Sequence, residues 1–521
     1  MSSVAALPRW DMSVVFPSLE SPELAAAFAS AVSAIDGLAA LFDEEHIAAR
    51  EPAPLDDATV RAVERVIARY NAVLDEVRTL GAYISAFVST NSRDDLAQAR
   101  QSELRLQTVK LAQLGTRFTA WVGSLDVDAL LLRSRVAREH EWLLRKAKMQ
   151  SAHLMSPAEE ALAVELNLTG GSAWGRLHSD LSSQLSVPVE LVDGARELPM
   201  SAVRNLAYDP DRDVRRRGYE AELAGWARAA VPLAAALNSI KGQVNVLSRR
   251  RGWESPLDEA IFDANIDRKT LDAMMTAAHE AFPDFRRYLW AKARALGVER
   301  LAWYDIFAPV GGGGKAWTFA DARTFVIEQF GAYSQRLSDF AARAFRERWI
   351  DAEPRPGKVD GAFCMSLRRD ESRVLSNFKP GYPGMSTLAH ELGHGYHNQC
   401  LAPRTMLQKG TPMTLAETAS IFCETLVRSA ALEQADAQGQ IEILEASLQG
   451  SCQVVVDITS RFLFERGVFE RRRERELSID ELNALMLQTQ RDTYGDGLDE
   501  AALHPYMWAV KSHYYSTGRS F

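Results

Sequence analysis

The residues best suited to carry out chemistry stand in one short run, H-E-L-G-H, at positions 390–394. Residues four apart lie on one face of a helix and one turn apart, so the imidazoles of His390 and His394 can reach the same metal ion. Glu391 stands beside the first histidine, where its carboxylate can hold a water molecule on that metal and accept a proton from it. The spacing therefore predicts a metal site that activates water.

The alternative is a helix whose histidines serve only its structure. The neighbours Leu388, Ala389 and Leu392 are apolar enough to bury this helix. Buried histidine and glutamate side chains then need polar partners, because an unpaired polar group in the interior costs free energy. A metal ion supplies such a partner, which favours the metal site over the purely structural helix.

A catalytic zinc ion needs a third protein ligand and an open fourth position. The first acidic residue after His394 is Glu417. His397 is nearer in the sequence, but on a straight helix it lies about 10 Å beyond His390, too far for zinc–nitrogen bonds of about 2 Å to gather all three imidazoles. We therefore expect His397 to pack or to support a ligand, and Glu417 to be the third ligand candidate.

Glu417 and Glu424 are seven residues apart and fall on one face of the helix predicted over residues 414–426. One carboxylate can bind the metal while the other orients a ligand histidine through a hydrogen bond. Thr414 and Glu417 also fit the capping box S/T-x-x-E, in which Glu417 would bond only the backbone of Thr414. The pattern leaves the ligand and the cap both open for Glu417.

The last part of the chain concentrates histidine and tyrosine. Hydrolysis of a peptide bond creates a tetrahedral oxyanion, and a tyrosine O–H or a histidine N–H can donate a hydrogen bond to it. An aromatic packing segment is the equal alternative for each tyrosine. The candidates are His504, Tyr506, His513, Tyr514 and Tyr515.

Most of the remaining sequence predicts helices, because apolar residues recur there at three-to-four spacing. Such stripes are typical of antiparallel amphipathic helices, and they contain no catalytic cluster of their own. The four longest stripes before the first break in the pattern cover residues 24–41, 60–86, 96–118 and 127–146.

Two stretches interrupt the helical pattern. Residues 186–199 alternate apolar residues around Asp193-Gly194, and residues 361–378 flank a polar turn, so each predicts a β-hairpin. We place a domain boundary near residue 200, with a helical N-terminal domain over 1–200 and a catalytic domain over 201–521.

The chain has 521 residues, with 60 Lys and Arg against 69 Asp and Glu, and a formal net charge of −9. An acidic protein is unsuited to nucleic acid as its main partner, because phosphate binding needs a positive field. The longest apolar runs, such as residues 229–237, are far shorter than the roughly 18–20 residues of a membrane span. The start lacks a secretory signal pattern, and four cysteines without a C-x-x-C pair are typical of reduced thiols. We therefore expect a cytoplasmic protein with no membrane partner.

The sequence HELGHGYH at 390–397, followed by LAETASIFCE at 415–424, resembles the oligoendopeptidase F branch of the thimet oligopeptidase family of zinc metallopeptidases. Segments that are similar to this family also occur far from the motif, so the resemblance extends over essentially the whole chain. These segments lie at 10–19, 304–309, 348–351 and 361–364.

The resemblance implies roles for individual residues. It implies that His390, His394 and Glu417 bind one Zn²⁺ ion per chain. It implies that Glu391 is the general base and proton shuttle, and that His513 contacts the substrate or the oxyanion. The chemistry of the oxyanion adds Tyr514 and Tyr515 as further catalytic candidates. Glu424 matches a family position near the metal.

The resemblance also implies a fold. We expect a mainly α, two-lobed metallopeptidase with a deep central channel that admits short unfolded peptides, and a small β-region near the metal helix. The family continues past the position of Ser520-Phe521 with additional tyrosines. On this comparison the catalytic domain is expected to be truncated, or different, at its C-terminus.

These observations predict a zinc-dependent endopeptidase that hydrolyses short unfolded peptides with water activated by the metal and by Glu391. One alternative is a zinc exopeptidase, a carboxypeptidase or aminopeptidase, which would need a charged group such as Arg368 or Lys379 to hold a peptide terminus. The other alternative is a catalytically weak, helical peptide-binding protein whose metal site is idle.

Overall fold

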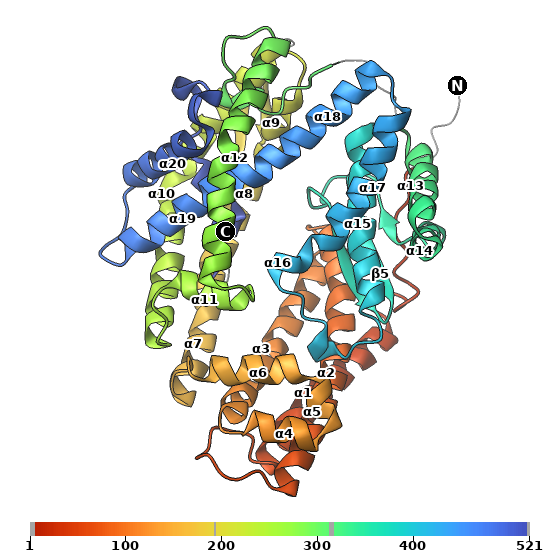
Figure 1. The fold of residues 1–521 in the computed structure, drawn as a ribbon, viewed down its shortest axis with the longest axis vertical. Coiled ribbons are helices and arrows are strands. Elements are labelled where there is room, and N and C mark those ends of the chain that lie inside the picture. Colours follow the sequence, from red (N-terminus) through yellow and green to blue (C-terminus); the bar gives the residue numbers. More distant parts are fainter. Residues whose placement is uncertain (1–5, 192–193, 312–316, 518–521) are drawn as a thin grey trace. The chain divides into compact units, whose positions relative to one another are not determined.

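The computed structural model describes residues 6–191, 194–311 and 317–517. Within these residues the chain is mainly helical, with one two-stranded and one three-stranded sheet (Figure 1). The predicted mainly α fold with a small β-region is confirmed. The predicted deep channel would lie between two halves of the molecule, so it depends on how those halves are placed. It stays a prediction.

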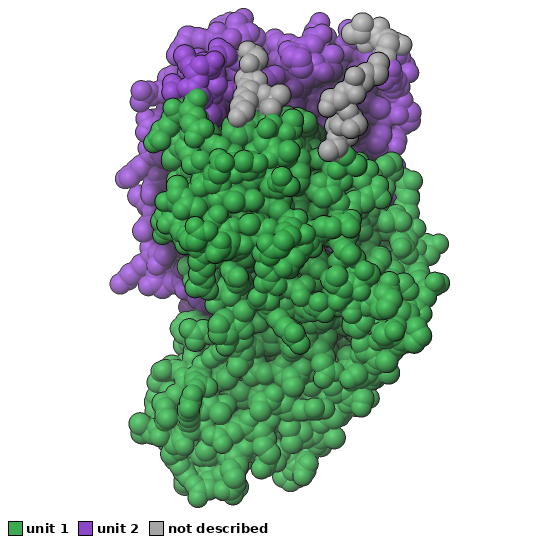
Figure 2. All heavy atoms as spheres, turned by 90° about the vertical axis from the view of Figure 1, so that its right-hand side faces the viewer, with its two compact units in different colours: residues 1–164, 315–434 green, residues 165–314, 435–521 purple. Residues whose placement is uncertain are grey.

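The chain packs as two compact units, and each is built from two separate stretches of sequence (Figure 2). Unit 1 contains residues 1–164 and 315–434, and unit 2 contains residues 165–314 and 435–521. The chain passes from one unit to the other at residues 164/165, 314/315 and 434/435. The predicted boundary near residue 200 lies inside unit 2 and coincides with none of these three points. Amphipathic stripes identify helices but do not show which distant helices pack together, so the discontinuous division had no signal in the sequence.

Long helices open unit 1 where the apolar stripes predict them. Each begins after a side chain that accepts a hydrogen bond from the backbone N–H three residues further on, which stabilises the first turn. These helices are α1 (Pro22–Glu44) after Ser21, α2 (Asp57–Thr90) after Asp56, and α3 (Asp95–Gly123) after Asp94. Shorter helices follow: α4 (Val127–Arg133), α5 (Arg135–Glu139), α6 (Glu141–Ser151) and α7 (Pro157–Thr169).

Helix α1 is long and apolar enough to cross a membrane, by length and composition only, and it is the single such helix in the described part of the chain. Its apolar residues do not form one unbroken run, because charged residues such as Asp36 interrupt them. Core helices meet the same criterion. The fully buried Ile35, Leu38 and Phe42 of α1 pack into the hydrophobic core of unit 1.

The second stretch of unit 1 carries a small sheet. Strands β4 (Phe363–Arg368) and β5 (Glu371–Leu375) form the predicted antiparallel hairpin, and β3 (Ile350–Asp351) pairs with β5 in parallel. The strand order β3-β5-β4 leaves β4 at an edge. β4 contacts both α2 and α15, so the sheet connects the N-terminal helices with the metal helix. The helices of this stretch are α13 (Phe319–Tyr333), α14 (Gln335–Arg346), α15 (Tyr382–Cys400), α16 (Met413–Ala416) and α17 (Thr418–Gln434).

Unit 2 contains the other predicted hairpin, β1 (Ser186–Leu191) with β2 (Gly194–Pro199), in antiparallel register. The predicted turn residue Asp193 lies outside the described residues. The helices of unit 2 are α8 (Gly171–Gln184), α9 (Met200–Asn205), α10 (Arg212–Arg250), α11 (Pro256–Asp263), α12 (Arg268–Ala295), α18 (Ala437–Cys452), α19 (Ile458–Arg472), α20 (Ile479–Tyr494) and α21 (Met507–Val510). A π-helical segment, Gln453–Asp457, joins α18 to α19.

All four cysteines are free thiols, as the sequence predicts. Cys423 and Cys452 are buried, Cys364 is half-buried and Cys400 is exposed. Burial raises the pKa of the Cys423 and Cys452 thiols to about 12, so both are protonated at neutral pH. Only Cys400 departs from the expectation of core thiols.

Candidate active site

Helix α15 presents both histidines of the H-E-L-G-H run on one side. Its first turn follows Gly381, whose φ of 137° suits glycine, and Leu388 and Leu392 bury the opposite side. His390 and His394 are half-buried, and their ring centroids lie 5.0 Å apart. The 3.6-residue period of the helix therefore brings the two imidazoles together, as the spacing predicts.

Glu417 reaches the two histidines from the junction between α16 and α17. Its Oε2 atom lies 3.1 Å from Nε2 of His390 and 3.2 Å from Nε2 of His394. The three ligand atoms all lie within 4.8 Å of one another. A tetrahedral metal ion with bonds of about 2.0–2.1 Å holds its ligand atoms about 3.3 Å apart, so this donor set fits Zn²⁺ in spacing and in chemistry.

The structure removes the capping alternative for Glu417. Helix α16 begins after Pro412 and ends at Ala416, and Glu417 is its C-cap residue. Thr414 lies inside α16 and does not precede a helix that contains Glu417, so the capping box is wrong. His397 lies in the last turn of α15 and does not belong to the group of His390, His394 and Glu417.

Both histidines are held through contacts on their other sides. Nδ1 of His390 lies 3.3 Å from Oε2 of Glu424, and the backbone carbonyl of Ala416 accepts a hydrogen bond from His394. Such contacts fix the tautomer of a ligand histidine and direct its second nitrogen toward the metal. Glu424 therefore lies where it can orient His390.

Burial and charge shift the pKa values in this group. Burial lowers the pKa of His390, but its hydrogen bond with Glu424 and the nearby carboxylates outweigh burial, so the net shift is upward. Burial lowers the pKa of His394 and keeps it neutral, the form that binds metals. Burial raises the pKa of Glu391 to about 7, and the charge of Glu417 adds to this against the opposing effect of His390.

Glu391 is only 5% exposed, and its Oε2 atom has no hydrogen-bond partner among the described residues. A buried carboxylate oxygen without a partner is costly, and such groups cluster at functional sites. Glu417 and Glu424 place two further carboxylates nearby, so a divalent cation in this group would reduce their mutual repulsion. The charges of the group and the spacing of its ligand atoms thus both favour a divalent cation at this site.

Two residues that sequence reasoning missed hold the group together. Ser420 donates a hydrogen bond of 2.6 Å to Oε2 of Glu417. A Cβ atom added at Gly393 would lie 2.6 Å from the carbonyl oxygen of Ala419 and 2.6 Å from Cα of Ser420. The serine stands three residues after Glu417, which is a weak signal, and nothing in the sequence shows that two backbones meet at Gly393.

The side-by-side packing of α15 and α17 depends on this contact (Figure 1). No side chain can stand at position 393 without moving one helix, because the opposing atoms belong to the backbone. Glycine in a helix interior destabilises the helix by roughly 0.5–1 kcal/mol relative to alanine, so its presence here serves the close approach.

The candidate oxyanion residues lie in unit 2, whereas the metal group lies in unit 1. The hydroxyl of Tyr514 donates to the carbonyl of Arg461 at 3.4 Å, and the Tyr515 ring stacks on His178 with centroids 3.9 Å apart. Both tyrosines are buried in the core of unit 2, and Tyr506 packs against that core. This matches the packing alternative for these rings.

His513 is exposed and follows α21 in a short helical turn of unit 2. His504 is fully buried, with Nε2 at 3.5 Å from Oε1 of Glu222. Because the metal group belongs to the other unit, the roles of His513, Tyr514 and Tyr515 at the oxyanion stay predictions.

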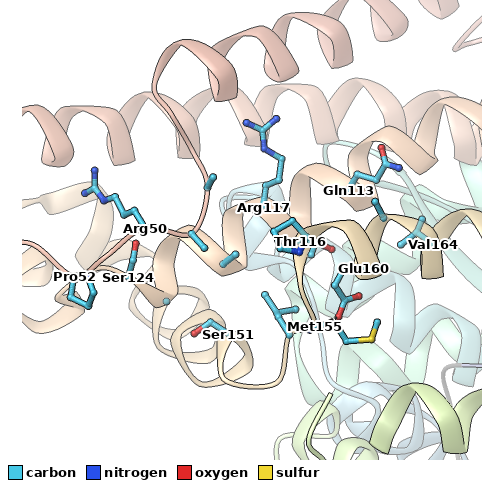
Figure 3. A pocket seen from close by; sticks show the side chains of 17 residues that line it. Arg50, Pro52, Gln113, Thr116, Arg117, Ser124, Ser151, Met155, Glu160 and Val164 are labelled. Carbon is cyan, nitrogen blue, oxygen red and sulfur yellow. Dashed lines mark hydrogen bonds between the residues drawn. The ribbon is translucent and has the colours of Figure 1, made fainter. Parts of the chain in front are cut away.

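Two cavities of unit 1 have linings that include none of His390, His394 and Glu417. The cavity in Figure 3 has a volume of about 660 Å³ and is lined by residues between Ala48 and Val164, including the buried Glu160. A smaller cavity of about 100 Å³ includes Arg368, whose Nε donates to Oε1 of Glu371 at 3.0 Å. Arg368, a proposed anchor for a peptide terminus, therefore already has an acidic partner.

Gly393→Ala tests the close approach of α15 and α17. We expect the added methyl group to destabilise the protein by about 1–3 kcal/mol, because it overpacks against backbone, and to weaken metal binding. The melting temperature and the zinc dissociation constant measure the two effects. Gly450→Ala is the matched control, because a Cβ atom at that helical glycine meets nothing within 4 Å. Equal behaviour of the two variants would contradict this account.

Comparison with known proteins agrees with the geometry. A profile of peptidase family M3 matches residues 327–518, which include the whole metal group. The chain is 23% identical over 446 residues to the group B oligopeptidase PepB of Streptococcus agalactiae, covering 83% of this chain and 74% of that protein. It is 22% identical over 461 residues to an oligoendopeptidase F homolog of Lactococcus lactis, covering 85% of this chain and 75% of the relative.

The fold is also shared with solved structures. The crystal structure of oligoendopeptidase F from Enterococcus faecium matches with a TM-score of 0.68 and 16% identity, over 95% of this chain and 83% of that chain. Together with the H-E-L-G-H helix and the carboxylate that meets it, the sequence matches show an oligoendopeptidase F-like chain, whose residues 327–518 match peptidase family M3 and which has distant homologues over most of its length.

Proposed function

We propose that this chain is a zinc-dependent endopeptidase that hydrolyses short, unfolded peptides, with one Zn²⁺ held by His390, His394 and Glu417. The observation that carries the proposal is the convergence of two Nε2 atoms on one carboxylate oxygen, at 3.1 and 3.2 Å. Two imidazoles and one carboxylate are a donor set typical of catalytic zinc. Zinc bound there would polarise the scissile carbonyl and lower the pKa of water toward neutrality.

Glu391 acts as the general base in this proposal. It accepts the proton of the attacking water and then gives it to the leaving amine. Its burial supports this role, because burial raises its pKa to about 7, close to the pH at which a base must both accept and return a proton. No covalent intermediate with the chain is needed, because water is the nucleophile.

The edge strand β4 supports binding of an extended peptide. β4 lies at the end of the order β3-β5-β4 and contacts α15, the helix that carries the histidines. An edge strand offers backbone hydrogen bonds without reading side chains, which suits a peptidase that acts on many peptides. Of the candidate oxyanion donors, His513 is the exposed one and is proposed for this role, where one such donor is typically worth about 10²–10³ in rate.

Replacement Glu391→Gln tests the general base. We expect kcat on a fluorogenic peptide to fall by about 10²–10⁴, because glutamine cannot accept the proton. Zinc content measured on the same sample is the control and should equal that of the wild type. A rate near that of the wild type with zinc bound would rule out this role for Glu391.

Removal of the metal tests the cofactor and the reaction together. We expect dialysis against a chelator to abolish cleavage of a peptide blocked at both ends, and added Zn²⁺ to restore it. Cleavage inside such a peptide distinguishes an endopeptidase from an exopeptidase, which needs a free terminus. Turnover that survives complete zinc removal would contradict metal chemistry, and zinc binding without turnover would favour a peptide-binding protein.

Glu424→Gln tests the orientation of His390. We expect metal affinity or activity to fall by about 10- to 100-fold, because the amide no longer supplies the charged acceptor opposite His390. Glu433→Gln on the same helix is the control, because Glu433 is exposed. The comparison uses kcat/KM and the zinc dissociation constant, and no difference between the two variants would exclude this role for Glu424.

A further inference from the structure

We propose that Ser420 is a positioning residue that holds the carboxylate of Glu417 in its metal-binding orientation before the metal binds. The inference rests on the proposed function, because it assumes that Glu417 is a metal ligand. Ser420 does not touch either histidine in this account and acts only through Glu417.

The first support is the hydrogen bond itself. The Ser420 hydroxyl lies 2.6 Å from Oε2 of Glu417 and 2.9 Å from the backbone carbonyl oxygen of the same residue. A hydroxyl has one proton and donates it to one acceptor at a time. The shorter contact goes to the charged acceptor, and hydrogen bonds of a hydroxyl to a carboxylate at this distance are among the stronger ones in proteins.

The second support is the contrast in burial. Ser420 is 0% exposed, whereas the side chain of Glu417 is 54% exposed. A half-exposed glutamate samples several rotamers in water, and a metal that selects one of them must overcome the lost rotamer freedom. A buried donor that already holds Oε2 removes much of this freedom in advance, which is how preorganisation raises affinity.

The third support is the fixed position of Ser420 relative to the histidines. Its Cα lies so close to Gly393 that no Cβ fits between them, and Gly393 stands between the two histidines on α15. The backbone contact thus sets where the hydroxyl lies, and the hydroxyl sets where Oε2 lies. A carboxylate oxygen has two lone pairs, so Oε2 can accept from Ser420 with one and meet the metal with the other.

A purely structural role is the competing account. Ser420 stands in the first turn of α17, where its hydroxyl could serve only the local backbone by donating to the carbonyl oxygen of Glu417. Loss of such a bond changes the local backbone but leaves the affinity of the Glu417 carboxylate for the metal unchanged. The two accounts therefore differ in whether the effect of Ser420 on metal binding needs Glu417.

A double-mutant cycle on metal affinity separates them. The variants are Ser420→Ala, Glu417→Ala and the double variant, with Zn²⁺ affinity measured by competition with a chromophoric chelator. We expect Ser420→Ala to weaken zinc binding by about 10- to 100-fold, the range typical of groups that hold a metal ligand. In the Glu417→Ala background the same change should have no further effect, because the carboxylate through which the serine acts is gone.

Three further measurements make the result specific. Ser338→Ala is the matched control, because Ser338 is a buried serine of unit 1 that donates to the carbonyl of Ile327 at 2.9 Å. It should bind zinc as the wild type does. The melting temperature of each metal-free variant reports folding, and the visible spectrum of the Co²⁺-loaded protein reports ligand geometry, which should change in Ser420→Ala.

The outcomes separate failure of the inference from failure of the proposed function. If Glu417→Ala binds zinc as tightly as the wild type, the metal assignment itself is wrong. If the wild type needs Glu417 but Ser420→Ala binds zinc unchanged, the positioning role is overturned and the metal site stands. If Ser420→Ala weakens binding equally with and without Glu417, Ser420 acts through the fold and the inference is overturned.

Discussion

The close approach of two helix backbones is the constraint on which the metal group depends. α15 supplies two histidines whose spacing is set by the helix itself, but a third ligand must come from elsewhere. Gly393 lets the start of α17 lie directly against α15, and only at that distance does the Glu417 carboxylate reach both Nε2 atoms. A larger residue at position 393 would separate the ligands even if every one of them were kept.

The three carboxylates of the group have distinct surroundings, and the surroundings match distinct tasks. Glu391 is buried with an unpaired oxygen, so its pKa rises toward neutrality. Glu417 is half exposed and accepts a hydrogen bond from Ser420, which suits a metal ligand. Glu424 faces the far nitrogen of His390. The surroundings of each side chain, rather than its residue type, thus determine which glutamate acts as base, as metal ligand or as the group that orients His390.

The sequence predicted well those features that local periodicity determines. The apolar stripes predicted helices α1 to α3, the alternating pattern around turn residues predicted both hairpins, and the four-residue spacing predicted that His390 lies beside His394. Features that depend on packing between distant segments could not be predicted from the sequence. Glu417 could be read as a ligand or as a cap because no local pattern shows which helix it will meet. The roles of Gly393 and Ser420 depend on the contact between α15 and α17, and so they had no clear signal.

The discontinuous units also bear on the order in which the chain can fold during synthesis. The core of unit 1 buries Leu367 and Leu375 together with residues of α1, α2 and α3. Those early helices therefore leave the ribosome with part of their apolar surface uncovered, and they must wait while about 150 residues of unit 2 are translated, which takes on the order of ten seconds. Throughout that interval the nascent chain needs protection from aggregation, by chaperones or by transient collapse. The interval ends when the second stretch of unit 1, residues 315–434, has been synthesised.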